Sequence, residues 1–263
     1  MVSIVSTNFR MSGGYINHLD LYDFIRSYKP KYYYMEETPL WRMLLETGRN
    51  YNLKRRIKMR ELESIDDDII ITDFRGLIVL SNEDIIIDCK KLIIMDCVEL
   101  TYHLNEIYSA PNWFFWFDFS YSDTIDKYLN NISCSEIVFL MPPSNHMKFT
   151  KKYPNFRSKA FFKKINVGVL KKVRKGFFDD YFSYSRRPEV LWYEQFGRRI
   201  FEHIILEKHV FFRNDPYMKD DGLSDYLKHY EIKFDGQRVT TTPQELTERM
   251  EDDGKYLRSE LLL

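Results

Sequence analysis

Two glutamates on either side of a glycine are the residues of this chain best suited to hold a ligand rich in hydroxyl groups. Seven residues separate Glu194 from Glu202, and Gly197 lies between them. Apolar residues at helical spacing predict an amphipathic helix over 196–206, which begins just after Glu194 and contains Glu202. A carboxylate accepts hydrogen bonds from paired sugar hydroxyls. The two glutamates therefore predict contacts to two sugar rings, such as a ribose and a hexose or pentose.

The start of this predicted helix suits a diphosphate between the two sugars. Gly197 lets a ligand approach the backbone closely, and the amides of the first turn, which includes Arg198, favour an anion. Upstream, Arg186 and Arg187 are adjacent. Their planar guanidinium groups match phosphate oxygens, so they are candidates to neutralise a diphosphate leaving group without a metal ion. The alternatives are a surface pair of arginines and a helix with solvated glutamates.

These residues resemble the EX7E element of retaining glycosyltransferases with the GT-B fold. The likeness consists of Glu-x-Phe-Gly from Glu194, a second glutamate eight positions later, and the stretch 206–212, which resembles the turn and strand that close the element. The resemblance implies two Rossmann-like domains facing a cleft. It also implies transfer of a hexose or pentose with retention, from a UDP-sugar that serves as co-substrate rather than cofactor. By resemblance, Glu194 contacts the donor sugar and Glu202 the nucleotide ribose, with Glu194, Arg186 and Arg187 taking part in catalysis.

Short, continuous apolar runs predict the strands of a parallel sheet. A run that does not alternate with polar residues fits a strand covered on both faces. Helical spacing lies between several runs, as at 18–28, so the chain is predicted to be a doubly wound α/β protein. The predicted strands of the first half are 2–7, 31–35, 68–72, 84–88, 91–95 and 136–141.

A pair of prolines, Pro142 and Pro143, follows the last of these runs and cannot continue a sheet interior. We expect a boundary here between an acceptor-side domain over 1–145 and a nucleotide-sugar-binding domain over 146–263. Near the end of the chain, Thr242 precedes Pro243 and predicts a capped helix over 243–262.

The first domain supplies weaker candidates. Gly13 and Gly14 follow the first predicted strand and resemble the glycine loop that faces the donor phosphates in GT-B enzymes, although an ordinary turn would look the same. Single histidines and aspartates are often structural, as core residues, caps or loop residues. With that alternative open, four residues are predicted to line the cleft on the acceptor side: His18, Asp73, His103 and Asp118.

The net charge is zero, yet the segment 151–175 contains ten Lys or Arg residues and no Asp or Glu. This concentration of charge predicts a polyanionic acceptor such as double-stranded DNA, held through its phosphates. The alanine-poor composition, rich in Ile, Lys, Tyr and Phe, is similar to that of T-even-like tailed phages, which glycosylate hydroxymethylcytosine in their DNA. The candidate DNA contacts are Lys151, Lys152, Lys163, Lys164, Lys171, Lys172 and Arg174.

Other interpretations of the basic segment remain. It is also compatible with a solvated face, and then the acceptor is a cell-surface glycan or a small molecule. A different class is a non-enzymatic nucleic-acid-binding α/β protein that uses 151–175 together with a second basic cluster at 54–60.

The cysteines and the hydropathy indicate the cellular compartment in which the protein is expected. Cys89, Cys97 and Cys134 form no CxxC pair, and Cys89 and Cys97, in or beside apolar runs, are predicted to be free buried thiols. An odd, sparse count of cysteines is typical of a cytoplasmic protein, in the host cytoplasm if the protein is viral. No apolar run approaches the roughly 20 residues that cross a bilayer. No metal site is expected, because the aspartates 66–68 precede a strand as a solvated turn would.

Overall fold

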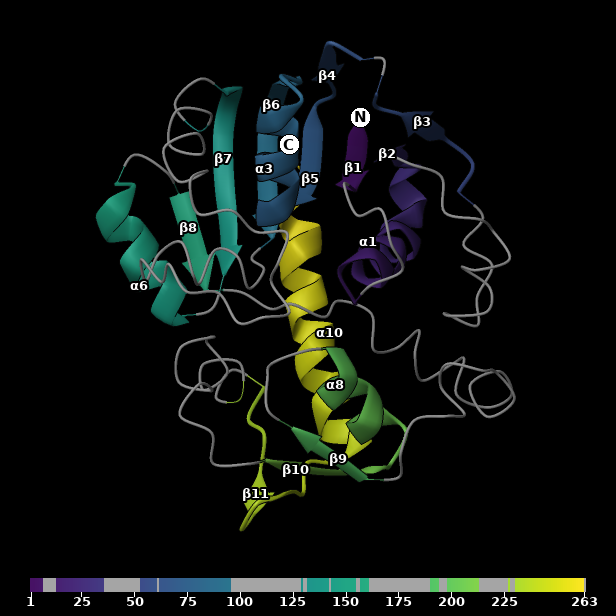
Figure 1. The fold of residues 1–263 in the computed structure, drawn as a ribbon, viewed down its shortest axis with the longest axis vertical. Coiled ribbons are helices and arrows are strands. Elements are labelled where there is room, and N and C mark those ends of the chain that lie inside the picture. The colour runs from purple at the N-terminus through teal and green to yellow at the C-terminus, as the bar shows by residue number, and fades with distance from the viewer. Residues whose placement is uncertain are drawn as a thin grey trace.

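A parallel sheet of eight strands, the large sheet, is the main feature of the computed structural model (Figure 1). Seven strands follow the order β3-β2-β1-β5-β6-β7-β8, and β4 pairs with β6. The structure describes residues 1–6, 13–35, 53–60, 62–95, 129, 132–141, 143–154, 157–160, 190–193, 198–212, 227 and 230–262. The chain therefore has a Rossmann-like α/β fold with a parallel sheet, as predicted, whereas the arrangement of two Rossmann-like GT-B domains stays a prediction.

The strands of the large sheet end in a common direction, since every pair is parallel. Their bounds are β1 Val2–Ser6, β2 Lys31–Tyr34, β3 Arg56–Lys58, β4 Ser64–Asp66, β5 Ile69–Asp73, β6 Ile86–Met95, β7 Ser133–Met141 and β8 Arg157–Ala160. In Figure 1 the arrows of β1, β5 and β7 point toward the half of the molecule that contains α8 and a second, smaller sheet.

Helices cover both faces of the large sheet. Alternate residues of its strands belong to two different cores, and each core contains residues of different helices. Ile4, Ile71 and Ile93 belong to one core, with residues of α1 (Gly13–Phe24) and α10 (Pro243–Glu260). Val5 and Ile70 belong to the other, with residues of α3 (Phe74–Asn82) and α6 (Pro143–Lys152). This double burial explains why the strands appear in the sequence as continuous apolar runs.

The strand order reverses between β1 and β5. From β1 the chain passes through α1, and the short 3-10 helix η1 (Arg26–Tyr28), to β2 on one side. From β5 it passes through α3 to β6 on the other side, and α1 and α3 lie on opposite faces. The carboxyl ends of β1 and β5 thus form a topological switch point, the position where open α/β sheets most often bind ligands.

The small sheet has four strands in the order β11-β12-β10-β9. Its parallel pair, β9 (Val190–Tyr193) and β10 (His209–Phe212), is joined by α8 (Arg198–Ile205). The hairpin of β11 (Phe234–Asp235) and β12 (Arg238–Val239) turns at Gly236, whose positive φ of 56° suits a residue without a side chain. The helix and the following strand predicted around Glu202 are therefore present as α8 and β10, and they are preceded by β9, which was not predicted.

Helix α10 connects the small sheet with the large one. It begins with the predicted cap: the Thr242 hydroxyl accepts from the Glu245 amide, and the Glu245 side chain accepts from the Thr242 amide. Its buried residues join α8 and α1 in one apolar core, where Gly254 packs against Phe24 with no room for a side chain. The same core therefore stabilises both sheets.

The far end of α10 is attached to the large sheet by a buried charge. Lys91, from β6, is only 8% exposed. Its Nζ donates to the Glu260 carbonyl at 3.0 Å and lies 3.5 Å from a carboxylate oxygen of Glu136 and 3.7 Å from one of Glu260. A lysine at the carboxyl end of a helix also suits the negative end of the helix dipole.

Two expectations about this region change, and a third stays a prediction. The runs 84–88 and 91–95, predicted as two strands, form the single strand β6, because Lys90 and Lys91 continue the ladder. The boundary expected after residue 145 stays a prediction, although the large sheet continues past it into β8. A free thiol at Cys89 was the wrong expectation, since Cys89 and Cys134 form a disulfide.

The disulfide follows from strand register rather than from spacing in the sequence. Cys89 and Cys134 are 45 residues apart, yet they face each other on neighbouring strands with their Cα atoms 4.9 Å apart. Neither of these two cysteines therefore has a free thiol. Within the described part of the chain, no helix has the length and apolar character needed to cross a membrane.

The attachment of α10 predicts unequal effects for two neighbouring lysines. Lys91→Met leaves the buried Glu260 carboxylate without its cation and should lower the free energy of unfolding by about 3–5 kcal/mol. Lys90→Met removes an exposed ion pair to Asp68 and should cost less than about 1 kcal/mol. Urea unfolding of both variants measures the difference, and equal losses would show that Lys91 does not hold the helix.

Candidate functional site at the carboxyl edge of the large sheet

Strand geometry brings two polar side chains together at the switch point. Ser6 ends β1 and Asp73 ends β5, and these strands are direct neighbours. Ser6 follows the apolar residue Ile4 on the same face of its strand, as Asp73 follows Ile71. Both polar side chains therefore project to the face that α1 covers.

His18, from α1, lies between these two side chains. Its Nδ1 is 2.9 Å from the Ser6 hydroxyl oxygen, and its Nε2 is 3.3 Å from Oδ2 of Asp73. Two of the four residues predicted for the acceptor side, His18 and Asp73, are thus in contact with each other. We call Ser6, His18 and Asp73 the switch-point site.

The donor and acceptor atoms of the three side chains determine the direction of each hydrogen bond. An ionised carboxylate only accepts, so the proton of neutral His18 lies on Nε2, facing Asp73, and Nδ1 accepts from the Ser6 hydroxyl. Burial lowers the pKa of His18 below its ordinary 6.5, the Asp73 charge opposes this shift, and Arg75 adds to it. The histidine is therefore neutral near pH 7, with one fixed tautomer.

Asp73 also begins helix α3. Its Oδ1 accepts from the Gly76 amide at 2.7 Å, which makes it the N-cap of that helix. A side chain at Gly76 would collide with Thr72, because an added Cβ would lie 2.0 Å from its Oγ1. Thr72 in turn donates to the Val5 carbonyl at 3.1 Å. The first turn of α3 therefore sits tightly on β5 and fixes the Asp73 carboxylate.

The other predicted site residues lie apart from this site or outside the described residues. Gly13 and Gly14 form the first turn of α1 rather than a loop before it. Arg198 and Glu202 belong to α8, and Lys151 and Lys152 are exposed at the end of α6. Eleven lie outside the described residues: His103, Asp118, Lys163, Lys164, Lys171, Lys172, Arg174, Arg186, Arg187, Glu194 and Gly197.

Sequence reasoning missed Ser6 and Gly76. A serine at the end of an apolar strand carries no motif, and only the position of β5 beside β1 shows that it faces His18. For Gly76, the sequence does contain an indicative pattern. A glycine three residues after an aspartate at a strand end fits a capped first helical turn that packs closely.

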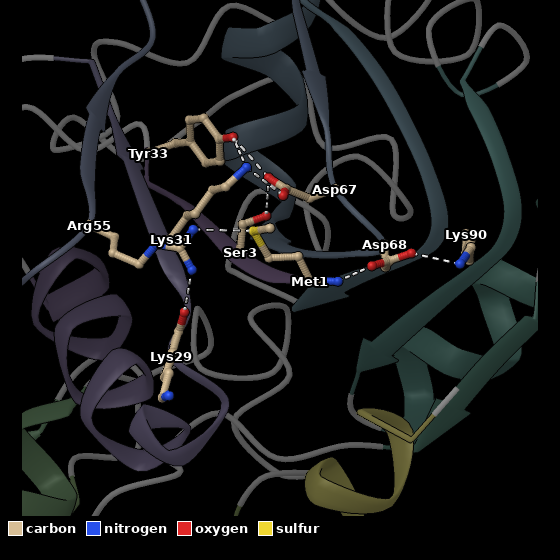
Figure 2. Close-up of polar contacts among 9 residues, drawn as sticks. All are labelled: Met1, Ser3, Lys29, Lys31, Tyr33, Arg55, Asp67, Asp68 and Lys90. Carbon is tan, nitrogen blue, oxygen red and sulfur yellow. Dashed lines mark hydrogen bonds and ion pairs between the residues drawn. The ribbon is translucent and has the colours of Figure 1, made fainter.

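A second polar cluster lies at the opposite, amino edge of the sheet (Figure 2). Asp67 is 4% exposed, so the expectation of a solvated turn is wrong for this residue. Its carboxylate accepts from Ser3 at 3.1 Å, from Lys31 at 2.7 Å and from Tyr33 at 2.8 Å. Burial and the Asp67 charge raise the pKa of Tyr33. With three donors around one buried carboxylate, this cluster joins β1 and β2 to the segment before β5 and has a structural role.

A surface groove of about 310 Å³ lies beside α10. Its charges pair within its own wall, Lys233 with Glu245 and Arg249 with Glu231. The groove therefore presents paired surface charges rather than a set of carboxylates directed at one point, as a catalytic centre needs. The groove is lined by Tyr230, Glu231, Lys233, Glu245, Glu248, Arg249 and Asp252.

Comparison with known proteins identifies no relative: the chain matches no family model and no curated sequence. Among the described residues, no three His, Cys, Asp or Glu side chains are grouped as a metal site requires. The chemistry proposed for the chain therefore depends on its own residues, and among those described the switch-point site is a hydrogen-bonded polar group at the carboxyl edge of the large sheet.

The neutral, buried His18 predicts a loss of stability in weak acid. The folded-state pKa lies below 6.5, so the unfolded chain binds the proton first and the stabilisation is lost as the pH falls below about 6.5. The slope should reach about 1.4 kcal/mol per pH unit, the value for one proton. Urea unfolding between pH 7.5 and 5 measures it.

Two variants isolate the histidine responsible. His18→Gln should flatten this slope, whereas His209→Gln, at an exposed histidine, should keep it. Asp68 and Glu245 have pKa values of about 2, because Lys90 and Lys233 donate to them, and so do not titrate in this window. An unchanged slope in His18→Gln would assign the effect to another group.

Proposed function

We propose that the protein is a glycosyltransferase that moves a sugar from a UDP-sugar to an acceptor hydroxyl, with retention as the resemblance implies. One observation carries the proposal. The glutamate pair falls on a parallel strand–helix–strand unit: residue 194 directly follows β9, and Glu202 lies within α8. In such a unit the turn after the first strand is where a bound diphosphate meets the helix amides.

The arrangement of the two sheets adds support for a GT-B type of architecture. The carboxyl edge of the large sheet is directed toward the half that contains α8, and α10 packs against α8 and the large sheet in one core (Figure 1). We propose that the donor binds at α8 and the acceptor at the carboxyl edge of the large sheet. Glu194 then contacts the donor sugar, Glu202 the ribose, and Gly197 and Arg198 the diphosphate.

We propose double-stranded DNA containing hydroxymethylcytosine as the first acceptor to test. Lys151 and Lys152 are exposed at the end of α6, beside the edge strand β8. The second basic cluster, 54–60, includes β3 at the opposite edge of the large sheet. Six strand spacings, or about 29 Å, separate the two edges. The two basic clusters are therefore separate patches at opposite edges of the large sheet.

Substitution of the glutamate pair tests the transferase proposal. Glu194→Gln and Glu202→Gln should each lower UDP release from the best UDP-sugar by about 10- to 100-fold, since each removes a charged hydrogen-bond acceptor. Glu251→Gln, an exposed residue of α10, is the matched control and should keep the wild-type rate. A screen of UDP-sugars, with and without hydroxymethylated DNA, supplies the assay.

Thermal shift with UDP separates this proposal from a non-enzymatic nucleic-acid-binding protein. A ligand that binds only the folded state raises the melting temperature, and the rise should be smaller in Glu202→Gln. The transferase proposal fails if wild-type protein neither binds UDP nor releases it from any UDP-sugar. If both glutamate variants match the control, the assignment of the donor site to Glu194 and Glu202 is wrong.

A further inference from the structure

The three side chains of the switch-point site, Ser6, His18 and Asp73, interact in series, and none of them belongs to the proposed donor site. We propose that Asp73 is the base that removes the proton from the acceptor hydroxyl, and that His18 and Ser6 position its carboxylate. This inference rests on the proposed transferase function. It assigns the acceptor half of the reaction to the carboxyl edge of the large sheet.

The burial of the three side chains decides which one meets a substrate. Ser6 is 0% exposed and His18 is 1% exposed, whereas the Asp73 side chain is 10% exposed. A hydrolase with a Ser–His–Asp triad needs its serine at the surface of the site. Here the order is reversed, because the serine is enclosed and the carboxylate is the member nearest to solvent. Among the three side chains, Asp73 is therefore the one that a substrate can reach. The enclosed Ser6 hydroxyl is excluded as a nucleophile.

The surroundings of Asp73 hold its carboxylate in one position. One oxygen accepts from the Gly76 amide at the amino end of α3, where the helix dipole favours a negative charge. The other oxygen faces Nε2 of His18 at 3.3 Å. Two carboxylate oxygens offer about four acceptor positions. Two of these are used, so the carboxylate can still accept from an acceptor hydroxyl.

Neutral His18 is the form that this role requires. With its proton on Nε2 it donates to Asp73, and the Ser6 hydroxyl, which donates to Nδ1, selects that tautomer. His18 and Ser6 are positioning residues, since neither is exposed to a ligand. The charged groups that face His18 are Asp73 and, more weakly, Arg75.

The proposed step balances without a further reactant. The acceptor O–H bond breaks and its proton passes to the Asp73 carboxylate. The acceptor oxygen forms a bond to the anomeric carbon of the donor on the same face from which the diphosphate leaves, so the configuration of that carbon is retained. The bond from that carbon to the diphosphate breaks, and UDP leaves with the electron pair. Asp73 then returns its proton to water.

Asp73→Asn is the sharpest test, because asparagine is also a good N-cap and should preserve α3. We expect kcat for sugar transfer to fall by about 100-fold or more, within the range of general base catalysis. The KM for the UDP-sugar and the UDP thermal shift should stay near wild type. The residual rate should rise with pH up to 9, where solvent base replaces the carboxylate. Asp252→Asn, at an exposed aspartate, is the matched control.

Variants at the positioning residues extend the test. His18→Gln and Ser6→Ala should lower kcat by less than Asp73→Asn does and should change the pH profile of kcat, which a purely structural loss would not do. The proposal is overturned if Asp73→Asn transfers sugar at the control rate. It is also overturned if the variant loses the UDP thermal shift together with its activity, since Asp73 would then be structural.

The two levels of inference fail differently. If wild-type protein transfers sugar and Asp73→Asn does so equally well, only the assignment of the base is wrong. If wild-type protein shows neither UDP binding nor transfer with any UDP-sugar, the transferase function is rejected and the base with it.

Discussion

A parallel sheet that is buried on both faces leaves few places for polar groups, and this constraint organises the molecule. Apolar residues fill both faces of β1, β5, β6 and β7. Residues of α1, α8 and α10 belong to one core, and residues of α3 and α6 belong to the other. Polar side chains can gather only where strands end. At the amino edge they form the closed cluster around Asp67. At the carboxyl edge they form the switch-point site.

The reversal of strand order makes the carboxyl edge different from the amino edge. Helices α1 and α3 leave β1 and β5 toward opposite faces. The ends of those strands are therefore adjacent without a helix directly between them. His18 from α1 and the first turn of α3 then approach Asp73 from two sides. A carboxylate held in this way has a fixed orientation and one remaining open side, as a catalytic group needs.

Helix α10 makes the two halves of the chain depend on each other. Its buried side chains belong to the core that includes both α1 and α8, and its last turn is anchored by Lys91. Residues more than 150 positions apart are thus held in one unit. The proposed function depends on this connection, because it holds the proposed donor unit near α8 and the proposed acceptor edge near β1 and β5 on one core.

Much of this fold could be predicted from local patterns. Continuous apolar runs located β1, β2, β5 and β7, and the Thr242 cap located α10. Short edge elements such as β3 and β4 were missed, because three residues carry too little periodicity. β6 was divided in two, since Lys90 and Lys91 interrupt its apolar pattern although Lys91 is buried by its partners.

The candidate site shows the same limit. His18 and Asp73 could be proposed from residue type and position, but their contact, and the part of Ser6, required knowledge of strand order. The Cys89–Cys134 pairing also depends on register between strands that are distant in the sequence. Local sequence carries periodicity and caps, whereas contacts between side chains of different strands arise only from the tertiary fold.

A crystal structure of the protein with UDP bound tests the central claim most directly. The account predicts the ribose beside Glu202, the diphosphate at the amino end of α8, and the terminal phosphate directed toward Asp73 at the carboxyl edge of the large sheet. UDP bound in the groove between Glu231 and Asp252, or on the face of α6, would contradict the account.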